Sequence, residues 1–374
     1  MQDMTMQLMD SICKTGAGPG LELKQVEVPV PGPGEVLIKI HKTAICGTDV
    51  HIYDWNEWSA QHVKPPMVIG HEYVGEIAAL GAGVTWLTIG QRVSGEGHIT
   101  CGHCRNCHTG NIQWCKNTTS VGVDRNGAFA EYLCIPARNV ILIAPSLDED
   151  VVAMFDAVGN ATHTALMFNL AGEDVLITGV GPVGILAVAI AKYAGARRVV
   201  VTDLNDYRLG LAKKIGADAA INSAKEDLTA AMREQGLVEG FDVGFEMFGS
   251  GAALRQMIGV MRNGGKISLL GLGNGPVQMD MNLVIGKGLT LQGIYGRKMD
   301  NWHQMSYAAE PRVYRFRQCP CLHLCFATAC YQSAGRSLSR GRIHGIFGSH
   351  AVSRRMNHLQ NHVIFTSLRV LSGL

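Results

Sequence analysis

The chain has 374 residues, of which 47% are hydrophobic and 17% charged, so it is long enough for two folded domains and too apolar for a disordered chain. It contains no run of about 18 apolar residues, and its first residues lack the basic and apolar regions of a secretory signal, so neither a membrane span nor an exported precursor is predicted. Residues 311–374 hold nine Arg but no Lys, Asp or Glu, so the formal charge of +2 hides a main body with 24 basic and 31 acidic residues. We therefore expect a cytoplasmic protein with no membrane or nucleic-acid partner.

The predicted elements change in type near residues 150–160. Before that point, short β-like runs alternate with Gly and Pro, at residues 36–40, 74–78, 92–94 and 130–135. After it, strands and helices alternate: strand 174–178, helix 184–193, strand 199–202 and helix 207–215, then strands 242–246, 266–270 and 289–294. The sequence therefore predicts a β-rich domain followed by a doubly wound parallel-sheet α/β domain, with the chain returning to the first domain near residues 295–300.

Eleven cysteines occur, and four of them fall in one short stretch, at Cys101, Cys104, Cys107 and Cys115. Four thiolates at this spacing can close a tetrahedral cage around Zn²⁺ and leave no position for a substrate, as in structural zinc sites. Two disulfides or scattered core thiols are the alternative. The clustering, with no secretory signal, favours the metal.

A second set of potential ligands is Cys46, His71 and Glu72. Taken singly, each is more often a core or capping residue. Together, and followed by the four-cysteine loop, they are typical of an open catalytic zinc site in which one position is left for the reacting oxygen. Asp156 is a further carboxylate that we place near this site, with a helix N-terminal cap as the alternative.

A glycine-rich turn, with glycines at Gly179, Gly181 and Gly184, directly follows the strand at 174–178. The Gly-x-Gly-x-x-Gly pattern alone is weak evidence for a dinucleotide site, because glycine turns are common. Here, however, a strand precedes it, an apolar helix follows, and Asp203 ends the next strand. This context predicts a dinucleotide pyrophosphate at the helix N-terminus and ribose hydroxyls at Asp203. An acid there disfavours a 2′-phosphate, so NAD is expected over NADP, although Arg208 nearby is of the kind that accommodates such a phosphate.

The segments 42–59, 70–77, 93–107, 155–166, 179–187 and 291–297 resemble the medium-chain, zinc-dependent dehydrogenase superfamily, and within it the L-threonine 3-dehydrogenase family. The resemblance covers about residues 25–305. It implies a GroES-like catalytic domain at residues 1–156, normally completed by the C-terminal return at 300–374, and a Rossmann NAD-binding domain at 157–299.

The resemblance also implies roles for individual residues. Cys46, His71 and Glu72 would hold the catalytic zinc and the four clustered cysteines the structural one, giving two zinc ions per chain. Thr48 and His51 would relay the substrate proton to solvent, assisted by Asp156. The NAD contacts implied are Val183, Asp203, Arg208, Leu270, Gly271, Leu272, Ile294 and Tyr295. The implied activity is oxidation of the C3 hydroxyl of L-threonine to 2-amino-3-oxobutanoate by a homotetramer, with another polyol or secondary-alcohol dehydrogenase as the alternative.

Residues 306–374 form an Arg- and Cys-rich tail that departs from the family pattern. A reading-frame shift near residues 305–310 would explain this composition. The alternatives are a genuine metal-binding extension and a basic arm for nucleic acid, the former built from Cys319, Cys321, His323, Cys325 and Cys330. Because such a tail would not complete the catalytic lobe, we expect weak or absent activity, and an inactive zinc- or NAD-binding relative is a further alternative.

Overall fold

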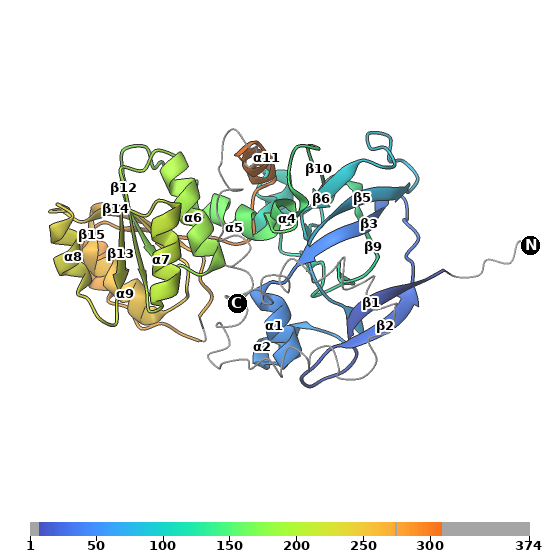
Figure 1. The fold of residues 1–374 in the computed structure, drawn as a ribbon, viewed down its shortest axis with the longest axis horizontal. Helices are drawn as coiled ribbons and strands as arrows, with labels where there is room; N and C mark the ends of the chain where they lie inside the picture. The colour runs from blue at the N-terminus through green and yellow to red at the C-terminus, as the bar shows by residue number, and fades with distance from the viewer. Residues whose placement is uncertain (1–6, 274, 309–374) are drawn as a thin grey trace, which may run out of the picture. The chain divides into compact units, whose positions relative to one another are not determined.

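The computed structural model describes residues 7–273 and 275–308. These residues fall into two compact units (Figure 1). The first comprises residues 7–156 and the chain from Trp302 onward, and the second runs from Ala157 to Asn301. The predictions of an altered tail and of its metal-binding alternative concern residues 309–374, which lie outside the described residues.

The first unit is built from antiparallel strands. Its largest sheet has five strands in the order β10-β6-β5-β3-β9: Val140–Leu142, Arg92–Gly95, Glu72–Leu80, Glu35–Ala44 and Tyr132–Pro136. A three-stranded sheet has the order β2-β1-β4: Glu22–Glu27, Leu8–Lys14 and Met67–Val68. A small ribbon pairs β7 (His98–Ile99) with β8 (Thr119–Ser120). This unit matches the predicted β-rich domain. β-Branched residues such as Val36 and Ile38 favour strands, and both are fully buried in its core.

Short helices join the strands of the first unit. They are α1 to α4 and the 3₁₀ turns η1 and η2: Gly47–Asp54, Glu57–His62, Arg105–His108, Glu149–Val152, Ile112–Trp114 and Ala137–Asn139. Helices α5 (Phe155–Ala165) and α11 (Met299–Ala308) span the points where the chain leaves and re-enters this unit. None of the helices in the described ranges is both long and apolar enough to cross a membrane.

The second unit holds a six-stranded parallel sheet in the order β13-β12-β11-β14-β15-β16: Ala219–Asn222, Arg198–Asp203, Asp174–Thr178, Phe241–Glu246, Met261–Leu269 and Thr290–Gly293. Its helices are α6 to α10: Pro182–Tyr193, Asp206–Ile215, Leu228–Glu234, Gly251–Val260 and Met281–Gly286. Helices α6 and α7 lie on one face of the sheet and α8 and α9 on the other (Figure 1). This is the predicted doubly wound arrangement, with the order of strands reversing at β11 and β14.

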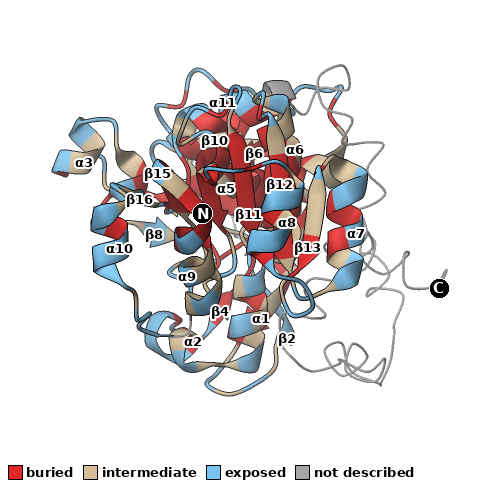
Figure 2. Ribbon diagram, turned by 90° about the vertical axis from the view of Figure 1, so that its left-hand side faces the viewer, coloured by how far each residue is buried: buried red, intermediate tan, exposed pale blue. Residues whose placement is uncertain are grey.

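Burial explains why the central strands read as continuous apolar runs in the sequence. Every residue of β11 is buried, and Figure 2 shows β11 in red while the outer surfaces of α8 and α10 are pale blue. Parallel strands covered on both faces need apolar side chains on both faces. Two acidic residues, Asp203 and Glu246, stand at the carboxyl ends of β12 and β14.

Candidate metal and dinucleotide sites

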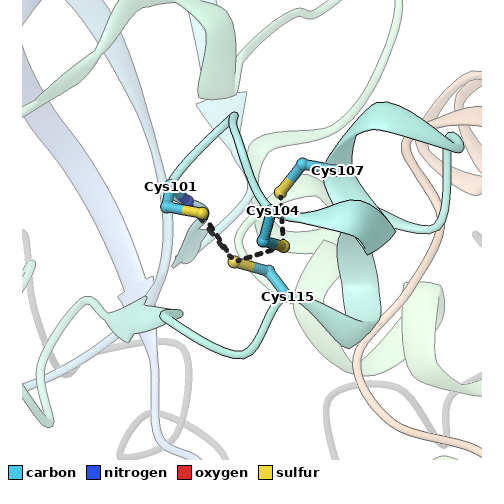
Figure 3. Close-up of side chains that lie close together, drawn as sticks. All are labelled: Cys101, Cys104, Cys107 and Cys115. Atoms are coloured by element: carbon cyan, nitrogen blue, oxygen red, sulfur yellow. Dashed lines mark hydrogen bonds between the residues drawn. The ribbon is translucent and has the colours of Figure 1, made fainter.

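The four clustered cysteines are brought together by a compact loop (Figure 3). Cys104 is the N-cap of α3 and Cys115 the C-cap of η1, so two tight turns point their thiols toward a common centre. The Sγ–Sγ distances are 3.5 Å from Cys104 to Cys107, 3.9 Å from Cys104 to Cys115 and 3.5 Å from Cys115 to Cys101. All four are free thiols, which argues against the disulfide alternative.

Backbone N–H groups prepare these thiols for a cation. The N–H groups of Cys101 and Asn117 both donate to the sulfur of Cys115, each at 3.4 Å. The backbone N–H of His103 is the largest influence on Cys101 and helps lower the pKa of that thiol to about 6, whereas burial raises the pKa of Cys107 to about 11. The ligand atoms of all four cysteines lie within 4.8 Å of one another, a donor set that fits tetrahedral Zn²⁺.

Strand pairing assembles the second donor set. Strands β3 and β5 are antiparallel with Ala44 opposite Glu72, so Cys46, two residues beyond Ala44, comes next to His71 and Glu72. The turn before His71 requires glycine, since Gly70 has φ +91° and a Cβ there would lie 2.2 Å from the Phe129 ring. The thiol, imidazole and carboxylate ligand atoms lie within 4.8 Å of one another.

The electrostatics of this second set fit a bound cation. Glu72 is 2% exposed, and its Oε2 has no hydrogen-bond partner among the described residues. Burial, followed by the negative charges of Asp49 and Asp156, raises the pKa of Cys46 to about 12, and burial raises the pKa of Glu72 well above its ordinary value. A cation at this point would supply the missing charge and reverse both shifts. Three protein ligands with an open fourth position is the donor set of a catalytic zinc site.

The side chains predicted to move a proton lie along α1. The Thr48 hydroxyl is 3.7 Å from the sulfur of Cys46. His51, one turn further on, is exposed, and its Nδ1 is 2.9 Å from Nδ2 of Asn56. Because Oδ1 of Asn56 accepts from the N–H of Ser59, its Nδ2 is the donor, and the neutral His51 ring therefore carries its proton on Nε2.

Two carboxylates, those of Asp49 and Asp156, lie close to the candidate metal ligands Cys46, His71 and Glu72. Asp156 is buried in the first turn of α5, inside the helix and not at its N-cap, and its charge acts on Cys46 and Glu72. Asp49, to which the sequence motifs assign no role, is buried on α1. Its Oδ2 accepts the N–H of Cys46 at 2.8 Å, and its Oδ1 lies 3.8 Å from Nδ1 of His71. The only sequence sign was an acid at the third position of a helix that begins after Cys46.

In the second unit, the glycine-rich turn joins β11 to α6. Gly179 has φ +85°, and a Cβ at Gly184 would lie 2.1 Å from the carbonyl oxygen of Gly179, so both positions require glycine. Gly181 is the N-cap of α6, and a Cβ there would meet no atom of the described residues within 4 Å. Val183 follows, partly buried, in the first turn of the helix. The backbone N–H groups of this turn are placed as an anion site requires.

The other predicted cofactor residues gather at the same carboxyl edge of the sheet. Asp203 ends β12; its Oδ2 accepts the N–H of Val180 and its Oδ1 the N–H of Asn205, both at 2.9 Å. Arg208 is half-buried in α7. Leu270, Gly271 and Leu272 follow β15, Ile294 and Tyr295 follow β16, and Leu272 and Tyr295 are exposed.

Comparisons with known proteins agree with both halves of the chain. Residues 32–145 match the alcohol dehydrogenase GroES-like domain and residues 182–310 match the zinc-binding dehydrogenase family. The L-threonine 3-dehydrogenase of Chromobacterium violaceum is 57% identical over 298 residues, covering 79% of this chain and 87% of that protein. The L-threonine 3-dehydrogenase of Deinococcus radiodurans is 55% identical over 300 residues, covering 80% and 86%.

Solved structures show the same fold. An Escherichia coli alcohol dehydrogenase complexed with NADH superposes with a TM-score of 0.76 at 28% identity, covering 82% of this chain and 88% of that one. A Sinorhizobium meliloti zinc-binding dehydrogenase bound to NADP gives a TM-score of 0.77 at 26% identity, covering 83% and 91%. The predicted fold class, a GroES-like domain with a Rossmann domain, is confirmed. With identity above one half over four fifths of its length, the chain belongs to the L-threonine 3-dehydrogenase family of zinc-binding dehydrogenases.

Proposed function

We propose that this protein oxidises the C3 hydroxyl of L-threonine with NAD, giving 2-amino-3-oxobutanoate and NADH. The observation that carries the proposal is the Cys46, His71 and Glu72 set, whose ligand atoms lie within 4.8 Å of one another and in which Oε2 of Glu72 is buried without a hydrogen-bond partner among the described residues. The choice of L-threonine as the substrate rests on the names of the relatives, which are L-threonine 3-dehydrogenases. Residues 1–156 would act as the catalytic domain and residues 157–299 as the NAD-binding domain.

The Cys46, His71 and Glu72 set would hold the catalytic zinc, and the loop from Cys101 to Cys115 the structural zinc. A zinc ion at the first site would supply Lewis-acid polarisation of the reacting hydroxyl. Asp49 would orient the site from behind, because it fixes the Cys46 backbone and faces Nδ1 of His71. Asp156 would add negative charge that favours the doubly charged cation.

The proton released from the substrate hydroxyl needs a route to water. Thr48, beside Cys46, would accept it at its hydroxyl oxygen and pass its own proton on toward His51. His51 is exposed, and its neutral ring carries a proton on Nε2; when Asn56 turns away, Nδ1 would accept the relayed proton, and Nε2 would then release its own proton to solvent. Asn56 would thereby determine which ring nitrogen of His51 is protonated.

NAD would bind along the carboxyl edge of the parallel sheet, where it supplies the hydride acceptor. The N-terminus of α6 would receive the pyrophosphate, while Asp203 would accept hydrogen bonds from the adenosine ribose. A carboxylate at that position repels a 2′-phosphate, which favours NAD over NADP even with Arg208 nearby. Val183, Leu270, Gly271, Leu272, Ile294 and Tyr295 would line the remainder of the cofactor site.

Resemblance to the family also supports a homotetramer located in the cytoplasm. Light scattering on the purified protein would measure the assembly directly. Two alternatives to the proposed activity stay open: oxidation of another polyol or secondary alcohol, and an inactive zinc- or NAD-binding protein if residues 306–374 do not complete the catalytic domain.

One experiment separates these outcomes: NADH formation from threonine, together with zinc content on the same sample. The proposed function predicts NADH formation with two zinc ions per chain, at the low rate expected from the altered C-terminal tail, and Cys46→Ser should lose that turnover and one zinc. Cys13→Ser is a matched control, because Cys13 is a buried free thiol whose contact is Ser11 and not a metal donor. Turnover on a butanediol or sorbitol but not on threonine would show that the protein is a polyol or secondary-alcohol dehydrogenase. Binding of zinc and NADH without any turnover would show that it is an inactive relative.

A further inference from the structure

A buried carboxylate stands at the carboxyl end of β14, in the middle of the parallel sheet, and none of the sequence motifs contains it. Glu246 is 3% exposed. Its Oε1 accepts the N–H of Phe248 at 3.1 Å and that of Gly249 at 3.0 Å, and its Oε2 lies 2.9 Å from the same Gly249 nitrogen. The side chain therefore folds forward over its own backbone and ties down the turn at residues 247–249.

That turn is packed against the glycine-rich loop on one side. A Cβ at Gly179 would lie 2.7 Å from the Cβ of Phe248, so the two segments touch with no room for a side chain between them. The N–H of Met247 also donates to the carbonyl of Thr178, the residue before Gly179, at 3.0 Å. Any shift of the turn would move the loop that we propose receives the pyrophosphate.

The same turn is packed against residues 270–273 on its other side. A Cβ at Gly271 would lie 2.0 Å from the nitrogen of Gly249, and a Cβ at Gly249 would lie 2.4 Å from the carbonyl carbon of Leu272. The backbone oxygen of Glu246 accepts the N–H groups of Leu270 and Gly271, at 2.9 and 3.0 Å. Glu246 thus bonds to one cofactor segment through its backbone and contacts the other through the turn that its side chain holds.

We infer that Glu246 is a positioning residue for the dinucleotide site, holding the pyrophosphate loop and the Leu270–Leu272 turn in register through the turn between them. The inference rests on the proposed function, since it assumes that NAD binds at this edge of the sheet. Its chemical basis is the donor arrangement. Both N–H groups meet at Oε1, and that of Gly249 also faces Oε2, so a glutamine would set its own N–H group against the Gly249 donor or leave Oε1 and would lose the charge that strengthens both bonds.

The N–H groups of the turn favour the charged form of Glu246, and burial opposes it. Burial raises the pKa of this carboxyl, while the N–H groups of Gly249 and Phe248 oppose that shift. A carboxylate buried at this cost is not the arrangement that stability alone would favour. Its contribution is expected in the geometry of the loops it joins.

The test compares Glu246→Gln with Asp242→Asn. Asp242 lies on the same strand, near its amino end. Its carboxylate also accepts a backbone N–H, from Asp174 at 2.8 Å, and pairs with Arg262. NADH affinity is measured by fluorescence titration, alongside the melting temperature and the KM values for NAD and threonine. We expect E246Q to weaken NADH binding about tenfold, equal to the loss of one charge-assisted hydrogen bond, and to raise the KM for NAD but not that for threonine. D242N should lower the melting temperature and leave NADH affinity unchanged within about twofold.

The outcomes distinguish the inference from the function on which it rests. If the wild-type protein binds NADH and E246Q binds it equally well, the inference is wrong and the proposed function stands. If the wild-type protein does not bind NADH, both are wrong. Should E246Q not fold, Glu246→Asp keeps the charge but shortens its reach by one methylene; NADH binding weakened by about threefold or more supports the inference, and unchanged binding overturns it.

Discussion

The chain enters the first unit a second time at Trp302, and the hydrogen bond made there can be removed without removing a ring. The indole Nε1 of Trp302 donates to Oε2 of Glu96 at 2.9 Å, and the two residues are 1% and 3% exposed. Replacing Trp302 by Phe keeps an aromatic ring in contact with Phe155, whose ring centroid lies 6.4 Å from that of Trp302, but deletes the donor.

The expected cost follows from the partner. A hydrogen bond to a charged group contributes about 1.5–3 kcal/mol, so W302F should lower the free energy of unfolding by about 2 kcal/mol. In a domain of 150–250 residues this corresponds to a fall in melting temperature of roughly 4–8 °C. Scanning calorimetry on the zinc-loaded protein measures it, and Glu96→Gln in the same background should cost less than in the wild type, because the pair is already broken.

Trp86→Phe is the matched control, since Trp86 is 59% exposed and should shift the free energy of unfolding by less than about 0.5 kcal/mol. If W302F and W86F melt together, the Glu96 contact does not hold the returning chain, and the assignment of Trp302 to the first unit fails with it.

Three further predictions follow from the sites. Cys104→Ser should lower the zinc content from two ions to one and the melting temperature by several degrees, since the Cys104 sulfur lies 3.5 and 3.9 Å from two of the other three sulfurs. A zinc content of two ions by plasma emission spectroscopy would contradict this. Gly184→Ala should weaken NADH binding in a destabilised protein, because its Cβ would lie 2.1 Å from a carbonyl oxygen, whereas Gly181→Ala, which meets no atom, should keep the wild-type melting temperature and weaken NADH binding alone. His163 is buried, which lowers its pKa, and donates to the Gly296 carbonyl at 2.9 Å, so the unfolded chain binds the proton more tightly and stability falls as the pH drops below about 6.5. His163→Asn keeps a donor and should lose less melting temperature between pH 7.5 and 5.5 than the wild type; an equal loss refutes this assignment.

Sequence spacing could predict that the candidate metal ligands converge, because the chain itself sets their geometry. Cys101, Cys104 and Cys107 are joined by two-residue turns, so whatever the rest of the fold does, their thiols stay within reach of one ion. The glycine loop is equally local, being a strand, a turn and a helix N-terminus in succession. Cys46 and His71 needed one more step, the antiparallel pairing of β3 with β5, and since neither strand alternates apolar and polar residues, the sequence pattern alone does not predict that pairing.

The carboxylates that hold these sites in place could not be predicted in the same way. Glu96 takes its partner from a residue 206 positions away, and no periodicity connects the two. Glu246 binds its near neighbours, but its importance comes from contacts between Phe248 and Gly179 and between Gly249 and Gly271, which exist only when three strand ends meet at one edge. A single acid at a strand end has the same appearance in sequence whether it faces solvent or joins two loops. Only the packing separates the two cases, since a carboxylate stripped of water must collect N–H donors, and the segments that supply them then become fixed to each other.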